Sequence, residues 1–294
     1  MPRRALLIVN TKSRSGAAQR DIAFERLKDH DIEPVHVECG RREDLSPLIV
    51  KHAKDVDCAI VGGGDGTLNA AAFGVIEAGL PLGILPLGTA NDLARTLEIP
   101  SDLDGAAQVI ADGHTRKIDL GIVNGEPFFN VASLGLSAEL AQQLTRDIKR
   151  RYGRLGYAMV ALKVLAQARP FRATIYSENE AVRVRTLQIA VGNGRFYGGG
   201  NAVEKDATID DHHLDLYSLE LDRAWKLALM ARSFRHGRHG AWNEVRAVRA
   251  KEFDIRTRKP KAVNADGEIV TQTPAHFSIR PSAVTVFAPK GSED

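Results

Sequence analysis

The sequence predicts two domains, an α/β N-terminal domain with a parallel sheet and a β-rich, antiparallel, sandwich-like C-terminal domain. Two observations predict this fold class. In the first third of the chain, short apolar runs alternate with helical segments, which is typical of βαβ units. Beyond Pro170, apolar and polar residues alternate with period 2, which is typical of antiparallel strands with one buried face. No proline- or serine-rich linker separates the patterns, so the boundary is drawn from periodicity.

The first domain is expected over residues 1–122. Its strands are apolar runs that lack alternation and end in turn residues, as strands buried on both faces do; they lie at 5–10, 58–64 and 82–88. Its helices show helical spacing of apolar residues at 18–30, 44–55 and 67–79. Because parallel strands end at one edge of a sheet, the loops that follow them are expected to bind a ligand there.

The second domain is expected over residues 123–281. Its predicted helices lie at 137–152, 155–168 and 222–237. Its predicted strands lie at 172–177, 182–193, 214–220, 253–258 and 276–281. The final segment, 282–294, is expected to form a C-terminal strand, at 284–289, and a tail that pack back on the first domain.

The composition is that of a globular protein, with 44% hydrophobic and 26% charged residues among 294. The net charge of +3 is too small to imply nucleic-acid binding. Cys39 and Cys58 fit neither a disulfide framework nor a zinc pattern, which favours a cytoplasmic protein. No stretch approaches the roughly 18 uncharged apolar residues of a membrane-spanning helix.

The first motif with chemical content is the glycine loop "GGGDGT" at 62–67. It lacks the lysine of a Walker A loop and the third glycine of the dinucleotide fingerprint. A strand, a glycine turn and a helix near Thr67 still provide an anion-binding helix N-terminus. Because Asp65 would repel bare phosphate, its carboxylate is expected to act through Mg²⁺, a water or the loop's own N–H groups. The alternative is a tight turn in which Asp65 or Thr67 is the N-cap.

A second loop, "LPLGTANDLARTL" at 85–97, repeats this arrangement, with Thr89 and Asn91 as expected caps of a helix that starts near Asp92. The two loops are expected to face one another across a crevice at the sheet edge. A third loop at 10–16 adds Lys12 and Arg14. Three such loops on one edge predict a phosphate site.

"GGGDGTLN" followed by "LPLGTANDLAR" resembles the diacylglycerol kinase catalytic domain, specifically that of the soluble bacterial lipid kinases. NAD kinases and phosphofructokinases carry relatives of the first motif, whereas "GTANDLAR" points to the lipid kinases. The resemblance continues in order through "KIDLG", "FFNVASLG", "VGNGRFYGGG", "ATIDDHHLDLYSL" and "NADGE". It implies an NAD kinase- and diacylglycerol kinase-like fold in which the first domain holds ATP and the second receives the lipid.

The resemblance implies a set of ATP-binding residues in the loops of the first domain: Asn10, Ser15, Gly16, Gly63, Gly64, Asp65, Gly66, Thr67, Asn69, Gly88, Thr89, Asn91 and Asp92. The chain departs from the family in two places. Its first loop is longer and lacks the usual proline, which leaves the roles of Lys12 and Arg14 open. Glu38 or Cys39 stands where the family has a threonine.

"NADGE" (264–268) by itself predicts a hairpin turn at Asp-Gly. The resemblance implies more: Glu268 would take the proton from the lipid hydroxyl as that oxygen attacks the γ-phosphoryl group. Asp266 and Asp65 are the other implied catalytic residues, and Asp266 is expected to contact metal or water.

"ATIDDHHLDL" resembles the family's structural Mg²⁺ segment. The implied ligands are the Asp211 carboxylate and the carbonyl oxygens of Thr208 and His213, hard donors that suit Mg²⁺. His212 stands where the family has glycine, which matters if that position has positive φ. A zinc site at His212 and His213 is not expected, because adjacent strand residues point to opposite faces.

The resulting hypothesis is an ATP- and Mg²⁺-dependent kinase of a diacylglycerol-like lipid. The alternatives are a kinase of a sphingoid, ceramide or phosphatidylglycerol-type alcohol, an NAD kinase-like enzyme, or a non-catalytic nucleotide- or lipid-binding module. The basic segments 146–154 and 232–239 are expected either to meet an anionic membrane surface peripherally or to form a solvated face. The expected partners are ATP, a membrane lipid and, in a homodimer, a second copy of the chain; no nucleic acid is expected.

Overall fold

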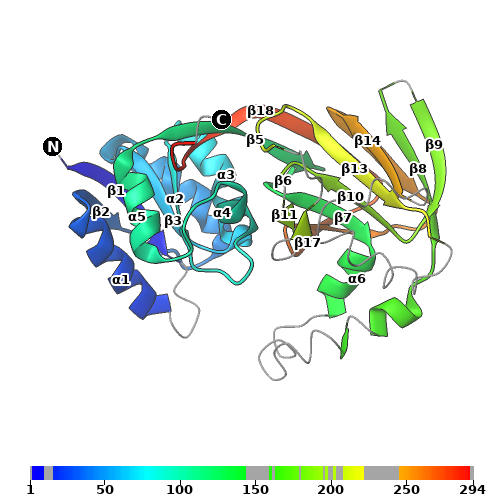
Figure 1. Cartoon of the computed structure of the whole chain (residues 1–294), viewed down its shortest axis with the longest axis horizontal. Helices are drawn as coiled ribbons and strands as arrows, with labels where there is room; N and C mark the ends of the chain where they lie inside the picture. The colour runs from blue at the N-terminus through cyan, green and yellow to red at the C-terminus, as the bar shows by residue number, and fades with distance from the viewer. Residues whose placement is uncertain are drawn as a thin grey trace. The chain divides into compact units, whose positions relative to one another are not determined.

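The computed structural model describes residues 2–9, 16–143, 159–160, 163–178, 180–194, 196–197, 201–202, 208–221 and 245–291. The chain divides into two compact units (Figure 1). The first unit comprises Met1–Leu120 and Pro281–Asp294, and the second comprises Gly121–Arg280. An α/β unit with a parallel sheet and a β-rich antiparallel unit confirm the predicted fold class.

The sheet of the first unit is parallel, as the strands buried on both faces predict. Its order is β2 (Ile32–His36), β1 (Arg3–Val9), β3 (Cys58–Gly63) and β4 (Leu82–Pro86). The chain moves from β1 to one side of the sheet and then crosses back to β3 on the other side. The topological switch point therefore lies between β1 and β3, and in open α/β sheets ligands bind there, beyond the carboxyl ends of the strands.

Five α-helices accompany this sheet among the described residues: α1 (Gly16–Asp29), α2 (Leu45–His52), α3 (Asp65–Ala78), α4 (Asp92–Thr96) and α5 (Leu103–Asp112). The helix α1 packs against α5, and α2 packs against α3. A Cβ on Gly74 of α3 would lie 2.6 Å from the Cα of Ser46 in α2, so the close approach of these helices requires glycine. The Ser46 hydroxyl donates to the Ala70 carbonyl and accepts from the Gly74 N–H, which satisfies the polar groups at this contact.

The second unit is a sandwich of two layers. One layer holds β8 (Phe171–Ser177), β9 (Glu180–Thr186), β15 (Glu252–Thr257) and the first half of β18 (Ala275–Phe287). The other holds β14 (Val245–Ala250), β13 (Leu214–Leu219), β10 (Gln188–Gly192), β7 (Val131–Gly135), β16 (Ala262–Ala265) and β17 (Glu268–Gln272). Their inward residues form one apolar cluster, in which Phe128 and Phe277 meet edge to face at 6.5 Å. The helix α6 (Leu136–Gln143) follows β7.

Two strand predictions need correction. The predicted strand 182–193 is two strands, β9 and β10, in different layers; the buried Thr186 hydroxyl bonds to the carbonyls of Gln188 and Leu219 where the chain changes layer. The predicted strands 276–281 and 284–289 are the single strand β18. It continues past Pro281 because Ser282, at φ 49°, donates its N–H to the buried Asp119 carboxylate at 2.6 Å.

Two helix predictions can be followed only in part. The segment 137–152 is helical through Gln143, and residues 159–160 and 163–167 of the segment 155–168 are helical. The predicted helix 222–237 and both basic segments, 146–154 and 232–239, lie outside the described residues. None of the helices in the described part of the chain has the length and apolar character that crossing a membrane requires.

The two cysteines provide a test of the first sheet. Cys58 is fully buried in β3, and burial raises the pKa of its thiol to about 12. Cys39 is partly exposed. Because the thiolate is the reactive form, we expect one thiol per chain to react with DTNB at neutral pH in the native protein, and both after unfolding. Two fast-reacting thiols in the native protein would contradict a central β3.

Candidate functional site

The helix after the first glycine loop begins one residue after Gly64. Gly64 is the N-cap of α3, with an extended backbone, and its carbonyl accepts the N–H groups of Thr67 and Leu68. Asp65 is the first helical residue, where a negative charge interacts favourably with the helix dipole. The alternative interpretation of Asp65 or Thr67 as the N-cap is therefore wrong.

The Asp65 side chain bonds to the second loop. Its Oδ1 accepts the backbone N–H of Leu93 at 3.0 Å, and the residue is buried. Leu93 is in the first turn of α4, whose N–H groups have no partner within their own helix. Asp65 therefore caps α4 from another helix, because its carboxylate accepts an N–H group that an N-cap side chain would otherwise accept. Its Oδ2 has no hydrogen bond to any residue that the structure describes.

The two glycine loops touch through their backbones. A Cβ on Gly88 would lie 2.4 Å from the Cα of Gly64, and the Leu87 N–H donates to the Gly63 carbonyl at 3.1 Å. A Cβ on Gly63 would also overlap the Thr67 side chain, at 2.6 Å. The loops were expected to face one another across a crevice, but they lie in direct contact because glycine removes the side chains that would separate them.

Asn91 shapes the second loop rather than capping the helix through its side chain. It occupies the N-cap position of α4 in the left-handed conformation, at φ 52°. Its Oδ1 accepts the Gly88 N–H at 2.9 Å, and its Nδ2 donates to the carbonyls of Pro86 and Gly88. Thr89 is exposed. The predicted helix start at Asp92 is confirmed, but side-chain capping of α4 by Asn91 is not observed.

The structure describes four further predicted nucleotide-binding residues. Asp92 and Asn69 are buried, and the Oδ1 of Asn69 has no hydrogen-bond partner among the described residues. Gly66 is in the first turn of α3, and Gly16 is the first residue of α1. The loop after β1, with Asn10, Lys12, Arg14 and Ser15, lies outside the described residues.

In the second unit, the Asp266 carboxylate binds a turn of backbone amides. It accepts the N–H groups of Phe129, Asn130 and Val131 at 2.7, 3.1 and 2.9 Å. Hydrogen bonds from backbone N–H groups to a carboxylate are among the strong ones in proteins. Asp266 therefore holds the hairpin between β16 and β17 against the start of β7, and we regard it as a positioning residue.

Glu268 is the first residue of β17, directly after this turn. Asp266 and Gly267 have φ values of 44° and 95°, and Ala265 pairs with Glu268. Positive φ at both central residues is the pattern of a type I′ turn, so the predicted Asp-Gly hairpin is confirmed. Glu268 is exposed. Its role as proton acceptor stays a prediction.

In the segment expected to hold structural Mg²⁺, the Asp211 carboxylate is already paired with a guanidinium from β14. His213 N–H donates to Oδ1 of Asp211 at 3.0 Å, and Arg249 Nη2 lies 2.5 Å from Oδ2. His212 has φ 62°, so the histidine that replaces the family's glycine is in the left-handed region. Thr208 is exposed. Since both carboxylate oxygens have partners and a guanidinium supplies the positive charge, these residues fit Mg²⁺ poorly, and we derive no step of the reaction from an ion there.

Sequence reasoning missed the residues that fix the second site. Asn193 Nδ2 donates to the Phe129 carbonyl at 2.8 Å, and the Gly267 N–H donates to Asn264 Oδ1. These asparagines brace the two sides of the Asp266 turn. Both stand in motifs that carried the family resemblance, "VGNGRFYGGG" and "NADGE", and an asparagine close to a glycine turn was the available signal.

Comparison with known proteins identifies what the chain resembles. A family model described as the diacylglycerol kinase catalytic domain matches residues 4–123. A second, described as a YegS C-terminal NAD kinase beta sandwich-like domain, matches residues 130–288. The two models follow the two units closely.

Curated relatives and solved structures agree. A diacylglycerol kinase of Mycobacterium tuberculosis is 32% identical over 294 residues, which cover 96% of this chain and 94% of the relative. A diacylglycerol kinase of Staphylococcus haemolyticus is 31% identical over 239 residues, 81% of this chain and 72% of the relative. A Bacillus anthracis crystal structure, provisionally described as a diacylglycerol kinase, superposes with a TM-score of 0.82 at 26% identity, over 97% of this chain and 95% of that one.

The roles of Asp266 and Glu268 can be separated by replacing each carboxylate with its amide. Asp266→Asn turns an NH₂ group toward backbone donors and should lower the free energy of unfolding by about 2 kcal/mol. Glu268→Gln changes an exposed residue and should leave the free energy of unfolding unchanged. Urea unfolding measures both, and equal effects of the two changes would contradict the positioning role of Asp266.

The Arg249 contact predicts how stability depends on Mg²⁺ in the absence of nucleotide. We expect EDTA to leave the melting temperature of the wild type unchanged, because Arg249 already neutralises Asp211. In Arg249→Gln the melting temperature should become dependent on Mg²⁺, since Asp211 and Asp215 both lose the guanidinium that lies within 4 Å of each. Arg246→Gln on the same strand, where the arginine pairs with Glu220, is the control. A wild type destabilised by EDTA would support the Mg²⁺ site predicted at Thr208, Asp211 and His213.

Proposed function

Because this chain belongs to the diacylglycerol kinase family and is a lipid kinase, we propose that it transfers the γ-phosphoryl group of ATP to the hydroxyl of a diacylglycerol-like lipid. The product is a phosphatidic-acid-like phospholipid. The reaction as proposed requires Mg²⁺.

The observation that supports ATP as the donor is the contact between the two glycine loops. At the carboxyl edge of the sheet, Gly63, Gly64 and Gly88 let the two loops pack closely, where a Cβ at any of the three would overlap its neighbours. The N-terminus of α3 lies in the same loop and offers N–H groups with the positive end of a helix dipole. We propose that these backbone groups form the phosphate site, without the lysine of a P-loop.

Asp65 is compatible with a phosphate site because one of its carboxylate oxygens bonds to the second loop. Its Oδ1 is committed to Leu93, which fixes the second loop against the first. Its Oδ2 and the buried Oδ1 of Asn69 are oxygen donors of the kind that Mg²⁺ prefers. In the proposed complex these residues hold Mg²⁺ directly or through its waters, and the ion neutralises phosphate charge when bound.

The acceptor side of the proposal uses the hairpin of the second unit. Phosphoryl transfer needs mainly alignment and charge neutralisation, so one positioned carboxylate suffices to accept the hydroxyl proton. Glu268 is that proposed acceptor: its proton comes from the lipid hydroxyl as the oxygen bonds to the γ-phosphorus and ADP leaves. Asp266 supports it by fixing the turn from which β17 starts.

The activity is tested by incubating the protein with labelled ATP, Mg²⁺ and separate acceptors: diacylglycerol, sphingoid base, ceramide, phosphatidylglycerol and NAD. We expect label in phosphatidic acid. Glu268→Gln should lower kcat by about 10²-fold or more because a general base contributes that much. Glu126→Gln, an exposed carboxylate of the same unit, is the matched control and should retain activity.

Other distributions of label would change the proposal in defined ways. Label on a sphingoid base, ceramide or phosphatidylglycerol alone would reassign the acceptor within the lipid kinases. Label on NAD would overturn the lipid acceptor. Full activity in Glu268→Gln would remove the proposed base while leaving the donor site standing.

A further inference from the structure

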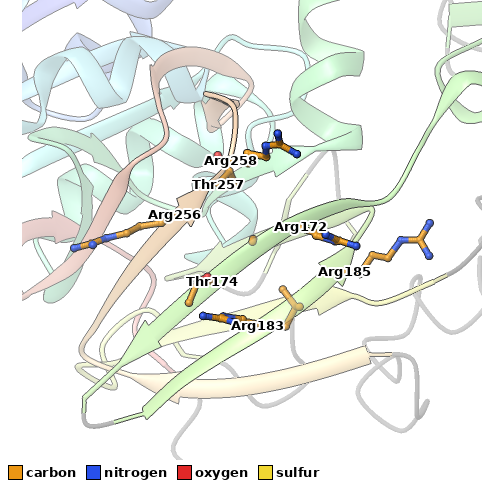
Figure 2. A pocket seen from close by; sticks show the side chains of 9 residues that line it. Arg172, Thr174, Arg183, Arg185, Arg256, Thr257 and Arg258 are labelled. Carbon is orange, nitrogen blue, oxygen red and sulfur yellow. The ribbon is translucent and has the colours of Figure 1, made fainter.

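Five exposed arginines gather on the outer side of one layer of the second unit. We call this surface the arginine face, and it consists of Arg172 on β8, Arg183 and Arg185 on β9, and Arg256 and Arg258 at the end of β15. Figure 2 shows these side chains on three neighbouring strands. They border a hollow of about 560 Å³, and no acidic residue is among the described residues that line it.

Strand register places these arginines together. Arg172 of β8 lies directly opposite Arg185 of β9, and the Thr174 position next along the same face has Arg183 on one side and Arg256 on the other. The residues between them, Ala173, Val184 and Ile255, point into the apolar core. The alternation "VRVR" therefore presents every second residue as a cation on one surface.

This arrangement is unfavourable for the fold itself. Like charges directly opposite one another in an antiparallel pair are destabilising. Elsewhere in the unit, Arg246 pairs with Glu220 and Arg249 with Asp211. The five arginines of the face have no ion pair with a described carboxylate, and the nearby Asp254 is paired with His276. The net charge of the chain is +3 and the face contributes +5, so the remainder sums to −2.

Protection of an edge strand explains part of this pattern. β9 lies at the end of its sheet, and charged residues on edge strands prevent pairing with other chains. That protection works with either sign of charge and with ion-paired residues. It does not require five cations without an ion pair to a described carboxylate, and it does not involve β15, which lies inside the sheet.

We propose that the arginine face docks the second unit on an anionic lipid bilayer. Guanidinium groups bind phosphate esters through paired hydrogen bonds, which suits phospholipid head groups. The exposed Tyr176 lies beside the face with Arg256 stacked 5.1 Å from its ring centre, and tyrosine favours the membrane–water interface. The arginines stand on three neighbouring strands around an open hollow, so several head groups can meet the face at once.

The choice of a bilayer rests on the proposed function, because an enzyme whose acceptor is a membrane lipid has to reach the membrane surface. The arginine face is separate from the basic segments 146–154 and 232–239, which lie outside the described residues. It therefore assigns membrane docking to strands of the sandwich, at residues that no motif of the sequence marked.

The test measures binding to vesicles of phosphatidylcholine with and without phosphatidylglycerol, by co-sedimentation at low and high salt. Wild type should bind only the anionic vesicles, and salt should weaken the binding. Arg183→Glu/Arg185→Glu should weaken it by at least about 25-fold, because each basic residue near such a surface contributes roughly fivefold.

The design separates docking from folding. Arg185→Glu places a carboxylate opposite Arg172, so the double variant should melt at an equal or higher temperature than wild type while losing vesicle binding. Arg183→Lys/Arg185→Lys keeps the charge and should retain most of the binding. Arg41→Glu/Lys54→Glu changes the net charge equally at exposed residues of the first unit and should bind like wild type.

Unchanged vesicle binding in Arg183→Glu/Arg185→Glu would overturn the proposal and leave edge protection as the role of these arginines. If this variant kept vesicle binding but lost binding to RNA, the face would be assigned to nucleic acid instead.

Activity on acceptor dispersed in neutral detergent micelles should be unaffected by these variants, whereas activity on anionic vesicles should fall with binding. Absence of kinase activity in every format, with vesicle binding intact, would overturn the proposed function and not the docking surface.

Discussion

The hydrogen bond between the Leu93 N–H and the Asp65 carboxylate is the constraint on which the first unit's site depends. It joins the first turns of two helices that follow neighbouring strands, and it allows Gly64 and Gly88 to lie in backbone contact. Without it, α4 would have an unsatisfied N–H in a buried position, where such groups are destabilising. A residue that looks unsuitable in an anion-binding loop is thus the one that fixes the geometry of that loop.

The second unit uses the same device. Asp266 receives three backbone N–H groups and fixes the turn that leads into β17, as Asp65 fixes the loop that leads into α4. At Asp211 a carboxylate is again held by protein donors, here His213 N–H and the Arg249 guanidinium. In all three cases an aspartate accepts backbone N–H groups and so fixes the backbone around it, which preorganises the site. The proposed catalytic carboxylate, Glu268, differs from these three in being exposed.

Several elements could be predicted because local pattern decides them. The apolar runs at 58–64 and 82–88 contain the buried strands β3 and β4, because residues without polar alternation suit a strand covered on both faces. The Asp-Gly turn at 266–267 has the two positive φ values that such a turn needs. Other predictions failed where a distant residue overrode the local signal. Pro281 does not end β18, because Asp119, far away in the sequence, accepts the N–H of Ser282. Asn91 stands at an N-cap position, yet its side chain turns back to the loop while Asp65 serves the helix.

The sequence by itself determined the fold class and the loops that matter, because hydrophobic periodicity and the spacing of glycine and aspartate are local properties of the chain. The family followed from the resemblance of its motifs. Only the tertiary structure decided the strand order that puts a switch point between β1 and β3, the backbone contact of Gly64 with Gly88, and the partners of Asp65, Asp211 and Asp266. It also brought arginines of β8, β9 and β15 onto one surface. Strand register and long-range hydrogen bonds join residues that are far apart in the chain, so no local pattern specifies them.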